Sequence, residues 1–187
     1  MMNMFEVSYL LLWVVVALQT YYIVQIGRRK QVQQANPQQG PTLVHEHHGV
    51  PAGATFPQLQ FDTINHGFID IAQMKKTGFL IAFTSVGCDQ CKLVYPILKR
   101  FQQARQDIQI IMLMQGSPDE IQHVVHQWEM TMPVVPILLE DMARLQTGYY
   151  PFIYYLSASA VVQTKSIINF EEQLNLLVKQ GQLKVAV

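Results

Sequence analysis

The pattern of apolar and polar positions after residue 50 predicts a domain in which buried strands and amphipathic helices alternate. Residues 78–85, GFLIAFTS, form an uncharged and mostly apolar run that is typical of a strand covered on both faces. Residues 91–103 carry apolar side chains at helical spacing, and Pro96 is expected to kink this helix without ending it. Residues 107–115, DIQIIMLMQ, leave little polar surface and predict a second buried strand.

The next segments continue the alternation. Ser117 and Glu120 have the spacing of a capping box, and Pro118 suits the first helical position, so a helix is predicted from about residue 118 to 129. Residues 134–141, VVPILLED, predict a third strand, and a short helix or turn is expected to follow it.

The last third of the chain predicts a hairpin and a closing helix. The apolar segments 149–157 and 161–168 are joined by the small-residue turn SASA, so they are expected to pair. Asn169 and Glu172 are expected to cap a final helix over residues 170–180. Together with a short edge hairpin expected between residues 50 and 74, this order predicts an α/β fold with a mixed sheet and helices on both faces.

The N-terminal segment has a different pattern. Residues 7–26 are uncharged and long enough, as a helix, to cross a hydrocarbon layer of about 30 Å. No basic region precedes this stretch and GRRK follows it, which favours an uncleaved transmembrane anchor over a cleaved signal peptide. The predicted organisation is a membrane anchor over residues 1–30, a Gln-rich flexible linker over 31–49 and a folded domain over 50–187.

The number and distribution of charged residues argue against a nucleic-acid partner. The chain has thirteen basic and thirteen acidic residues, and the basic ones are spread out except at residues 28–30. A nucleic-acid-binding surface therefore has no support. Because the three cations follow the predicted span, the charge rule by itself would place the domain in the cytoplasm.

Cys88 and Cys91 are the only cysteines in the sequence, and they stand where the strand over 78–85 gives way to a helix. A sulfur at a helix start faces unpaired amide groups and the positive end of the helix dipole, which stabilises its thiolate. Cys91 lies one turn further along the same face, so it can resolve a mixed disulfide formed at Cys88. Half of a zinc site is disfavoured, because such a site needs four ligands and the sequence has no second pair of cysteines. A purely structural disulfide is also disfavoured, because a loop as short as that between Cys88 and Cys91 constrains the unfolded chain little.

Several stretches resemble a known family. FTSVGCDQCKLVYPIL and YYPFIYYLSASAVV resemble the thioredoxin-like superfamily, and the N-terminal anchor with GVPAGATFPQLQ resembles its membrane-tethered TlpA-like branch. FTSVGCDQCK and the QIG after the anchor are most similar to the MauD-like proteins that assist maturation of methylamine dehydrogenase. The resemblance covers about residues 50–180 and implies a thioredoxin-like fold with a redox-active disulfide between Cys88 and Cys91.

The resemblance also assigns residues beyond the cysteines. It implies that the bond between Tyr150 and Pro151 is cis and that the backbone of Tyr150 binds an extended substrate chain by strand addition. Tethered relatives hold the redox domain outside the cytoplasm, which opposes the charge rule, and the domain is expected to be extracytoplasmic. Reducing members carry a tryptophan before the first cysteine and a buried carboxylate on the preceding strand, but these positions here are Gly87 and Ala82. Asp89 is then the nearest carboxylate.

The predicted function is a membrane-anchored thiol:disulfide oxidoreductase without a cofactor or metal, with Cys88 and Cys91 as catalytic residues and Tyr150 and Pro151 as substrate-binding residues. Its expected partners are a cysteine-containing client protein, a redox protein that resets the pair, and the lipid bilayer. One alternative is a metal-handling module that delivers copper through the cysteines and the histidines at positions 45, 47 and 48. Another is a scaffold for maturation that has no catalytic activity.

Overall fold

The computed structural model describes residues 13–21, residue 43 and residues 47–185. The chain divides into two units, Met1–Gly40 and Pro41–Val187. In the first unit, residues 13–21 are helical and their side chains are exposed. None of the helices formed by the described residues combines the length and the apolar character needed to span a bilayer. The predicted span over residues 7–26 extends beyond the described residues on both sides.

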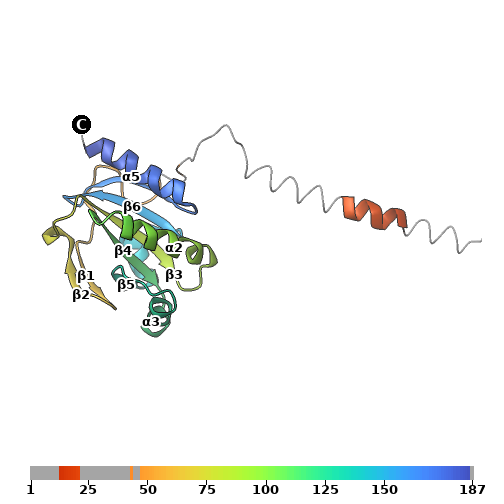
Figure 1. Ribbon diagram of the computed structural model, residues 1–187, viewed down its shortest axis with the longest axis horizontal. Coiled ribbons are helices and arrows are strands. Elements are labelled where there is room, and N and C mark those ends of the chain that lie inside the picture. Colours follow the sequence, from red (N-terminus) through yellow and green to blue (C-terminus); the bar gives the residue numbers. More distant parts are fainter. Residues whose placement is uncertain (1–12, 22–42, 44–46, 186–187) are drawn as a thin grey trace, which may run out of the picture. The chain divides into compact units, whose positions relative to one another are not determined.

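The second unit is built on a five-stranded sheet with the order β5-β4-β3-β6-β7 (Figure 1). The central strand β3 (Gly78–Ser85) pairs in parallel with β4 (Ile108–Gln115) and antiparallel with β6 (Phe152–Ser157). The outer strands are β5 (Val134–Ile137), parallel to β4, and β7 (Val162–Ile167), antiparallel to β6. The predicted mixed sheet is therefore confirmed, and β3 has the bounds that its apolar run predicted.

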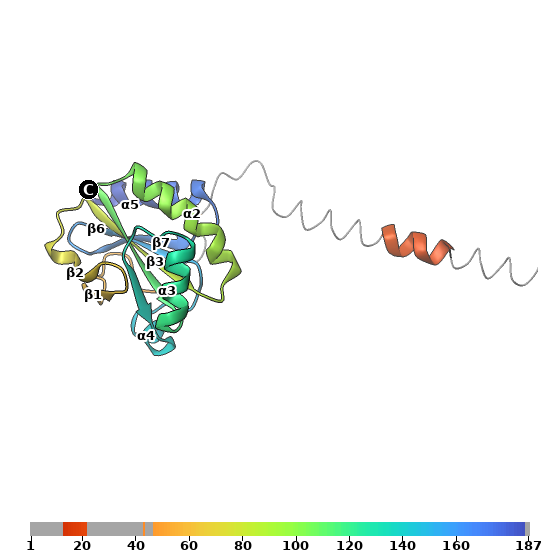
Figure 2. The ribbon, with the colours of Figure 1, turned by 60° about the horizontal axis from the view of Figure 1, so that its bottom comes forward.

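Two hydrophobic cores cover the two faces of the sheet because side chains alternate along each strand. Leu80 and Ala82 point into a core shared with α2 (Asp89–Ala104), α3 (Pro118–Gln127) and α5 (Glu171–Val185). Figure 2 shows α2 and α5 together on one side of the sheet. The opposite face packs against α4 (Leu139–Arg144) and a small hairpin. Helices thus flank both faces, as predicted.

The hairpin consists of β1 (Gln60–Thr63) and β2 (Gly67–Asp70), and the short 3-10 helix η1 (Ile71–Gln73) follows it. It forms its own two-stranded sheet and does not extend the edge of the central one. Asn65 holds it in place, because its side chain accepts a hydrogen bond from Val134 N–H (2.9 Å) and donates one to the Met132 carbonyl (2.9 Å).

The predicted end of the third strand and the predicted cap of the last helix are wrong. The third strand ends at Ile137, because the Asp141 carboxylate accepts a hydrogen bond from Leu138 N–H (2.9 Å) and turns the following residues into α4. At the last helix the side chain that accepts from Asn169 N–H is that of Gln173 (2.8 Å), not Glu172.

Other local predictions are confirmed. The capping box at the start of α3 is present: Ser117 N–H donates to the Glu120 carboxylate (2.9 Å), and the Ser117 hydroxyl accepts from Glu120 N–H (3.4 Å). Helix α2 continues through Pro96, as predicted.

The end of the predicted linker is fastened to the domain by a buried lysine. The Lys165 ammonium, on β7, donates to the carbonyls of Gly49 (3.0 Å) and Val50 (2.6 Å). Val50 N–H in turn donates to the Tyr154 hydroxyl (3.1 Å). Burial lowers the pKa of Lys165, because the protonated amine is stripped of water. The chain is thus held against the sheet from Gly49 onward.

Gly181 provides a test of how α5 packs. It lies buried in α5, where a Cβ atom would collide with the Tyr155 ring and lie 3.0 Å from the Thr164 hydroxyl. Alanine is the better helix former, by about 1 kcal/mol. We expect overpacking to outweigh that gain, so that Gly181→Ala lowers the free energy of unfolding by about 1 kcal/mol. The measurement is urea denaturation.

The matched control is Asn175→Ala on the exposed side of the same helix, which is expected to raise stability slightly. If Gly181→Ala stabilised the protein as Asn175→Ala does, the close packing of α5 on β6 and β7 would be refuted.

Candidate active site

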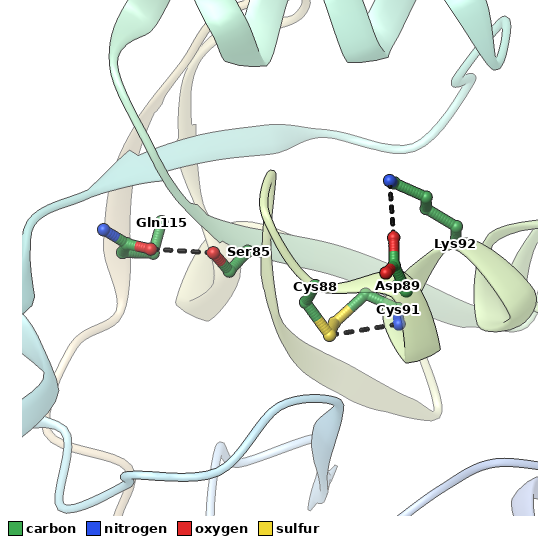
Figure 3. Close-up of a disulfide and its surroundings, with 6 residues drawn as sticks. All are labelled: Ser85, Cys88, Asp89, Cys91, Lys92 and Gln115. Carbon is green, nitrogen blue, oxygen red and sulfur yellow. Dashed lines mark hydrogen bonds and ion pairs between the residues drawn. A yellow bond between two sulfur atoms is a disulfide. The ribbon is translucent and has the colours of Figure 1, made fainter.

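Cys88 and Cys91 form a disulfide at the N-terminus of α2 (Figure 3). Their Cα atoms are 5.3 Å apart. Cys88 is the N-cap residue of the helix, and its sulfur accepts a hydrogen bond from Cys91 N–H (3.1 Å). The sulfur of Cys88 therefore occupies the place that a serine or aspartate oxygen takes in an ordinary helix cap.

The turn that carries Cys88 is tied to the ends of the two central strands. Cys88 N–H donates to the Ser85 carbonyl (3.1 Å), and Val86 N–H donates to the Gln115 carbonyl (3.0 Å). The Ser85 hydroxyl also donates to the Gln115 side-chain oxygen (2.7 Å), as Figure 3 shows. These bonds fix the start of α2 directly beyond the carboxyl ends of β3 and β4.

The two sulfurs differ in their access to solvent. Cys88 is partly exposed, whereas Cys91 is fully buried in the core that contains Leu80 and Ala82. A second molecule can therefore reach Cys88, while Cys91 is accessible only to Cys88. This asymmetry suits the predicted roles of Cys88 as the attacking sulfur and Cys91 as the resolving one.

The carboxylate next to Cys88 is paired. Asp89 forms an ion pair with Lys92 (2.8 Å), and both side chains are largely exposed (Figure 3). The Lys92 ammonium lowers the pKa of Asp89, so this carboxylate is ionised at neutral pH. Its repulsion of a Cys88 thiolate is offset in part by Lys92 and by the positive end of the helix dipole.

The loop before β6 lies at the same end of the sheet as the disulfide. The bond between Tyr150 and Pro151 is cis, as predicted, and β6 begins at Phe152, opposite Phe83 of β3. The Tyr150 ring packs against both cores, and its hydroxyl donates to the Met142 sulfur (2.9 Å). Burial raises the pKa of Tyr150 to about 12. Tyr150 and Pro151 thus lie at the disulfide end of the sheet, and their role in substrate binding stays a prediction.

His48 packs beside the cis bond, a contact that the sequence did not predict. Its ring packs edge-on against Tyr149 (ring centroids 4.5 Å apart) and against Phe152 (5.8 Å), on either side of the cis bond. Both aromatic partners are about a hundred positions away in the sequence, so no local pattern could reveal this contact. Residue 45 of the histidine group lies outside the described residues, and no three metal-ligating side chains gather among the residues described.

Ala82 lies on the face of β3 that is turned toward Cys91. It is completely buried and belongs to the same core as Cys91. A methyl group therefore occupies the position where the family resemblance led us to look for a carboxylate, in the same core as Cys91.

The chain is similar in sequence to proteins named methylamine utilization protein MauD. It is 23% identical to that of Paracoccus versutus over 173 residues, covering 92% of this chain and 86% of the relative. It is 24% identical to that of Methylorubrum extorquens over 175 residues, covering 92% and 84%. No family model matches the sequence.

Solved structures share the fold. The thioredoxin domain of a Bacteroides vulgatus thiol-disulfide oxidoreductase superposes with a TM-score of 0.60 at 14% identity, covering 70% of this chain and 97% of that one. A thiol:disulfide interchange protein of Chlorobium tepidum gives 0.60 at 13% identity, covering 71% and 98%. The domain therefore has a thioredoxin-like fold.

The pair formed by Asp89 and Lys92 allows a test of the electrostatics at Cys88. Asp89→Asn removes a negative charge beside the sulfur and leaves the cation, so we expect reduced Cys88 to react with iodoacetamide about two- to threefold faster at neutral pH. Lys92→Gln should slow the reaction by a similar factor. The measurement is the alkylation rate against pH with Cys91 replaced by serine, so that Cys88 is the only thiol.

The double variant carrying both changes is the matched control and should react at nearly the rate of the parent. A shift of the rate in the same direction by both single changes would contradict this view of the site.

Proposed function

We propose that this thioredoxin-like, MauD-like protein is a membrane-anchored thiol:disulfide oxidoreductase that exchanges disulfides with client proteins through Cys88 and Cys91. The observation that carries the proposal is the disulfide itself, which joins a partly exposed sulfur at a helix start to a fully buried one. An exchange enzyme needs this difference, because one sulfur must meet the client and the other must be reserved for the second step.

The exchange proceeds in two balanced steps when the pair is reduced. The Cys88 thiolate attacks one sulfur of a client disulfide, and the other client sulfur leaves as a thiolate and takes up a proton. Cys91 then attacks the Cys88 sulfur, which forms the bond between Cys88 and Cys91 and releases the second client thiol. Two electrons pass from the protein to the client. The same steps in reverse oxidise a client dithiol.

Tyr150 and Pro151 are proposed to shape the client groove. The pairing of β6 with β3 ends at Phe152, so Tyr150 precedes the paired segment and lies at the disulfide end of the sheet. An extended client segment can bind the Tyr150 backbone by strand addition, which would bring a client sulfur toward Cys88.

The site of action is proposed from the sequence. Residues 7–26 would anchor the chain in the bilayer with the redox domain on the extracytoplasmic side. The client is proposed to be an exported protein that contains cysteines, and the naming of the relatives for methylamine utilization indicates the process in which to look for it. A separate redox protein would reset the Cys88–Cys91 pair after each turnover.

Cys91→Ser tests the exchange reaction. Without the resolving thiol, a mixed disulfide formed at Cys88 persists, so we expect covalent adducts between the full-length variant and client proteins in cells. The adducts should disappear on reduction. The measurement is non-reducing electrophoresis followed by identification of the trapped proteins.

Cys88→Ser is the matched control and should trap nothing, because it lacks the accessible sulfur. The exchange function is rejected if Cys91→Ser forms no adduct and the wild-type protein leaves protein disulfides untouched. In that case a variant lacking both cysteines should retain the cellular function, as a scaffold would.

The anchor and its orientation are tested separately. We expect the full chain to sediment with membranes and to resist carbonate extraction, and a chain lacking residues 1–30 to be released. A reporter fused to the C-terminus and active only outside the cytoplasm should be active. Activity only of a cytoplasmic reporter, or extraction of the full chain by carbonate, would overturn this part of the proposal.

A further inference from the structure

Two buried hydroxyl groups near the disulfide lack hydrogen-bond partners. Tyr95 is on α2, four residues after Cys91, and Thr84 is next to the last residue of β3. Their side chains are 1% and 0% exposed. Neither hydroxyl oxygen has a hydrogen-bond partner among the described residues. Because leaving a buried polar group unpaired costs free energy, such groups call for an explanation.

The two hydroxyls lie close to one another. Burial raises the pKa of Tyr95, and the neighbouring Thr84 hydroxyl opposes that rise, although the two groups do not achieve hydrogen-bonding geometry. The Tyr95 ring also packs edge-on against Trp128, with centroids 5.5 Å apart. These contacts hold the phenol in one orientation, with its oxygen at the carboxyl end of β3.

The carboxyl end of β3 is joined directly to the turn that carries the disulfide. Thr84 precedes Ser85, whose carbonyl accepts the hydrogen bond from Cys88 N–H. Cys91 and Tyr95 are one helical turn apart on the same face of α2 and belong to the same core. Long side chains on a helix lean toward its N-terminus, so Tyr95 leans toward the turn that carries Cys91.

Cys91 needs a polar neighbour once the disulfide opens. Its thiolate then stands in an apolar core, where desolvation disfavours the charged form. On the facing side of β3, Ala82 supplies no polar group. The nearby hydroxyls of Tyr95 and Thr84 are neutral donors, and neither has a hydrogen-bond partner among the described residues.

We propose that the Tyr95 and Thr84 hydroxyls donate hydrogen bonds to the sulfur of Cys91 when it becomes a thiolate during exchange. This inference rests on the proposed oxidoreductase function and assigns it two further residues. In the resolving step the Cys91 thiolate forms a bond to Cys88, and the bond between Cys88 and the client sulfur breaks. The proton lost by Cys91 is balanced by the one that the departing client thiolate takes up. Both hydroxyls keep their own protons throughout.

Other titratable groups around Cys91 have different positions. Asp89 and Lys92 pair with each other in solvent at the helix start. The Tyr150 hydroxyl is engaged with the Met142 sulfur. Tyr155 belongs to the same core but lies at the other end of the sheet, where it contacts Gly78 and Gly181. Tyr95 is thus the phenol that shares a helical turn with Cys91.

A dipyridyl disulfide separates the two steps in the reduced full-length protein. With one equivalent of reagent, Cys88 attacks first and releases one thiopyridone. Cys91 then resolves the Cys88–pyridyl mixed disulfide and releases the second. Stopped-flow absorbance therefore gives a first phase that reports Cys88 and a second phase that reports Cys91, and each is measured against pH.

Tyr95→Phe removes only the hydroxyl. We expect it to slow the second phase about tenfold at neutral pH and to move its pH midpoint upward, because a hydrogen bond to a charged group is lost. Thr84→Val should act in the same direction by a smaller factor. Thr84→Ser keeps the hydroxyl and should restore the wild-type profile. The first phase should be unchanged in all three variants.

Tyr155→Phe is the matched control, since it removes a phenolic hydroxyl from the same core at the opposite end of the sheet, and it should leave both phases unchanged. An unchanged second-phase midpoint in Tyr95→Phe and Thr84→Val would overturn the proposal. If Tyr95→Phe does not fold, the comparison of Thr84→Val with Thr84→Ser decides. Failure of the proposed function gives a result distinct from failure of this inference. In that case the dipyridyl disulfide still reacts in two phases, but Cys91→Ser traps no protein client in cells.

Discussion

The strand β3 determines where the disulfide of this domain lies. It is the central strand, paired on one side with β4 and on the other with β6, and all eight of its residues are buried. Where β3 ends, hydrogen bonds to Ser85 and Gln115 set the start of α2, and Cys88 caps that helix. The accessible sulfur therefore stands on a rigid base at a helix N-terminus, where a thiolate is favoured.

The same packing makes the two sulfurs unequal. Cys91 is one turn into α2, on the side that faces the core, so the folding of the helix onto β3 necessarily buries it. Cys88 stays at the surface beside the exposed pair of Asp89 and Lys92. The difference in accessibility between the two sulfurs follows from the position of each residue on one helix.

The sequence predicted the features that depend on local patterns. The apolar run predicted the bounds of β3, and the spacing of Ser117 and Glu120 predicted the capping box. The cis bond before Pro151 was implied by the resemblance to thioredoxin-like proteins and not by a local pattern. It could not predict contacts between distant segments. The aromatic packing of His48 and the binding of Gly49 by Lys165 both join residues about a hundred positions apart. The strand β5 was predicted to run too far, because its apolar pattern continues past Ile137 while the hydrogen bond from Leu138 N–H to the Asp141 carboxylate starts a helix there.

The absence of a carboxylate at position 82 bears on the resolving step of the proposed exchange. In the proposed exchange, a reduced pair would pass through a Cys91 thiolate when it resolves a mixed disulfide, and an oxidised pair would expel the same thiolate when a client attacks Cys88. A group that stabilises this thiolate makes Cys91 easier to deprotonate and a better leaving group, but it also lowers the nucleophilicity of the thiolate. Cys91 is buried in the same apolar core as Ala82, so desolvation makes its thiolate costly in either direction. The direction of electron flow would be set by the reduction potential of the Cys88–Cys91 pair relative to those of the client and of the protein that resets it.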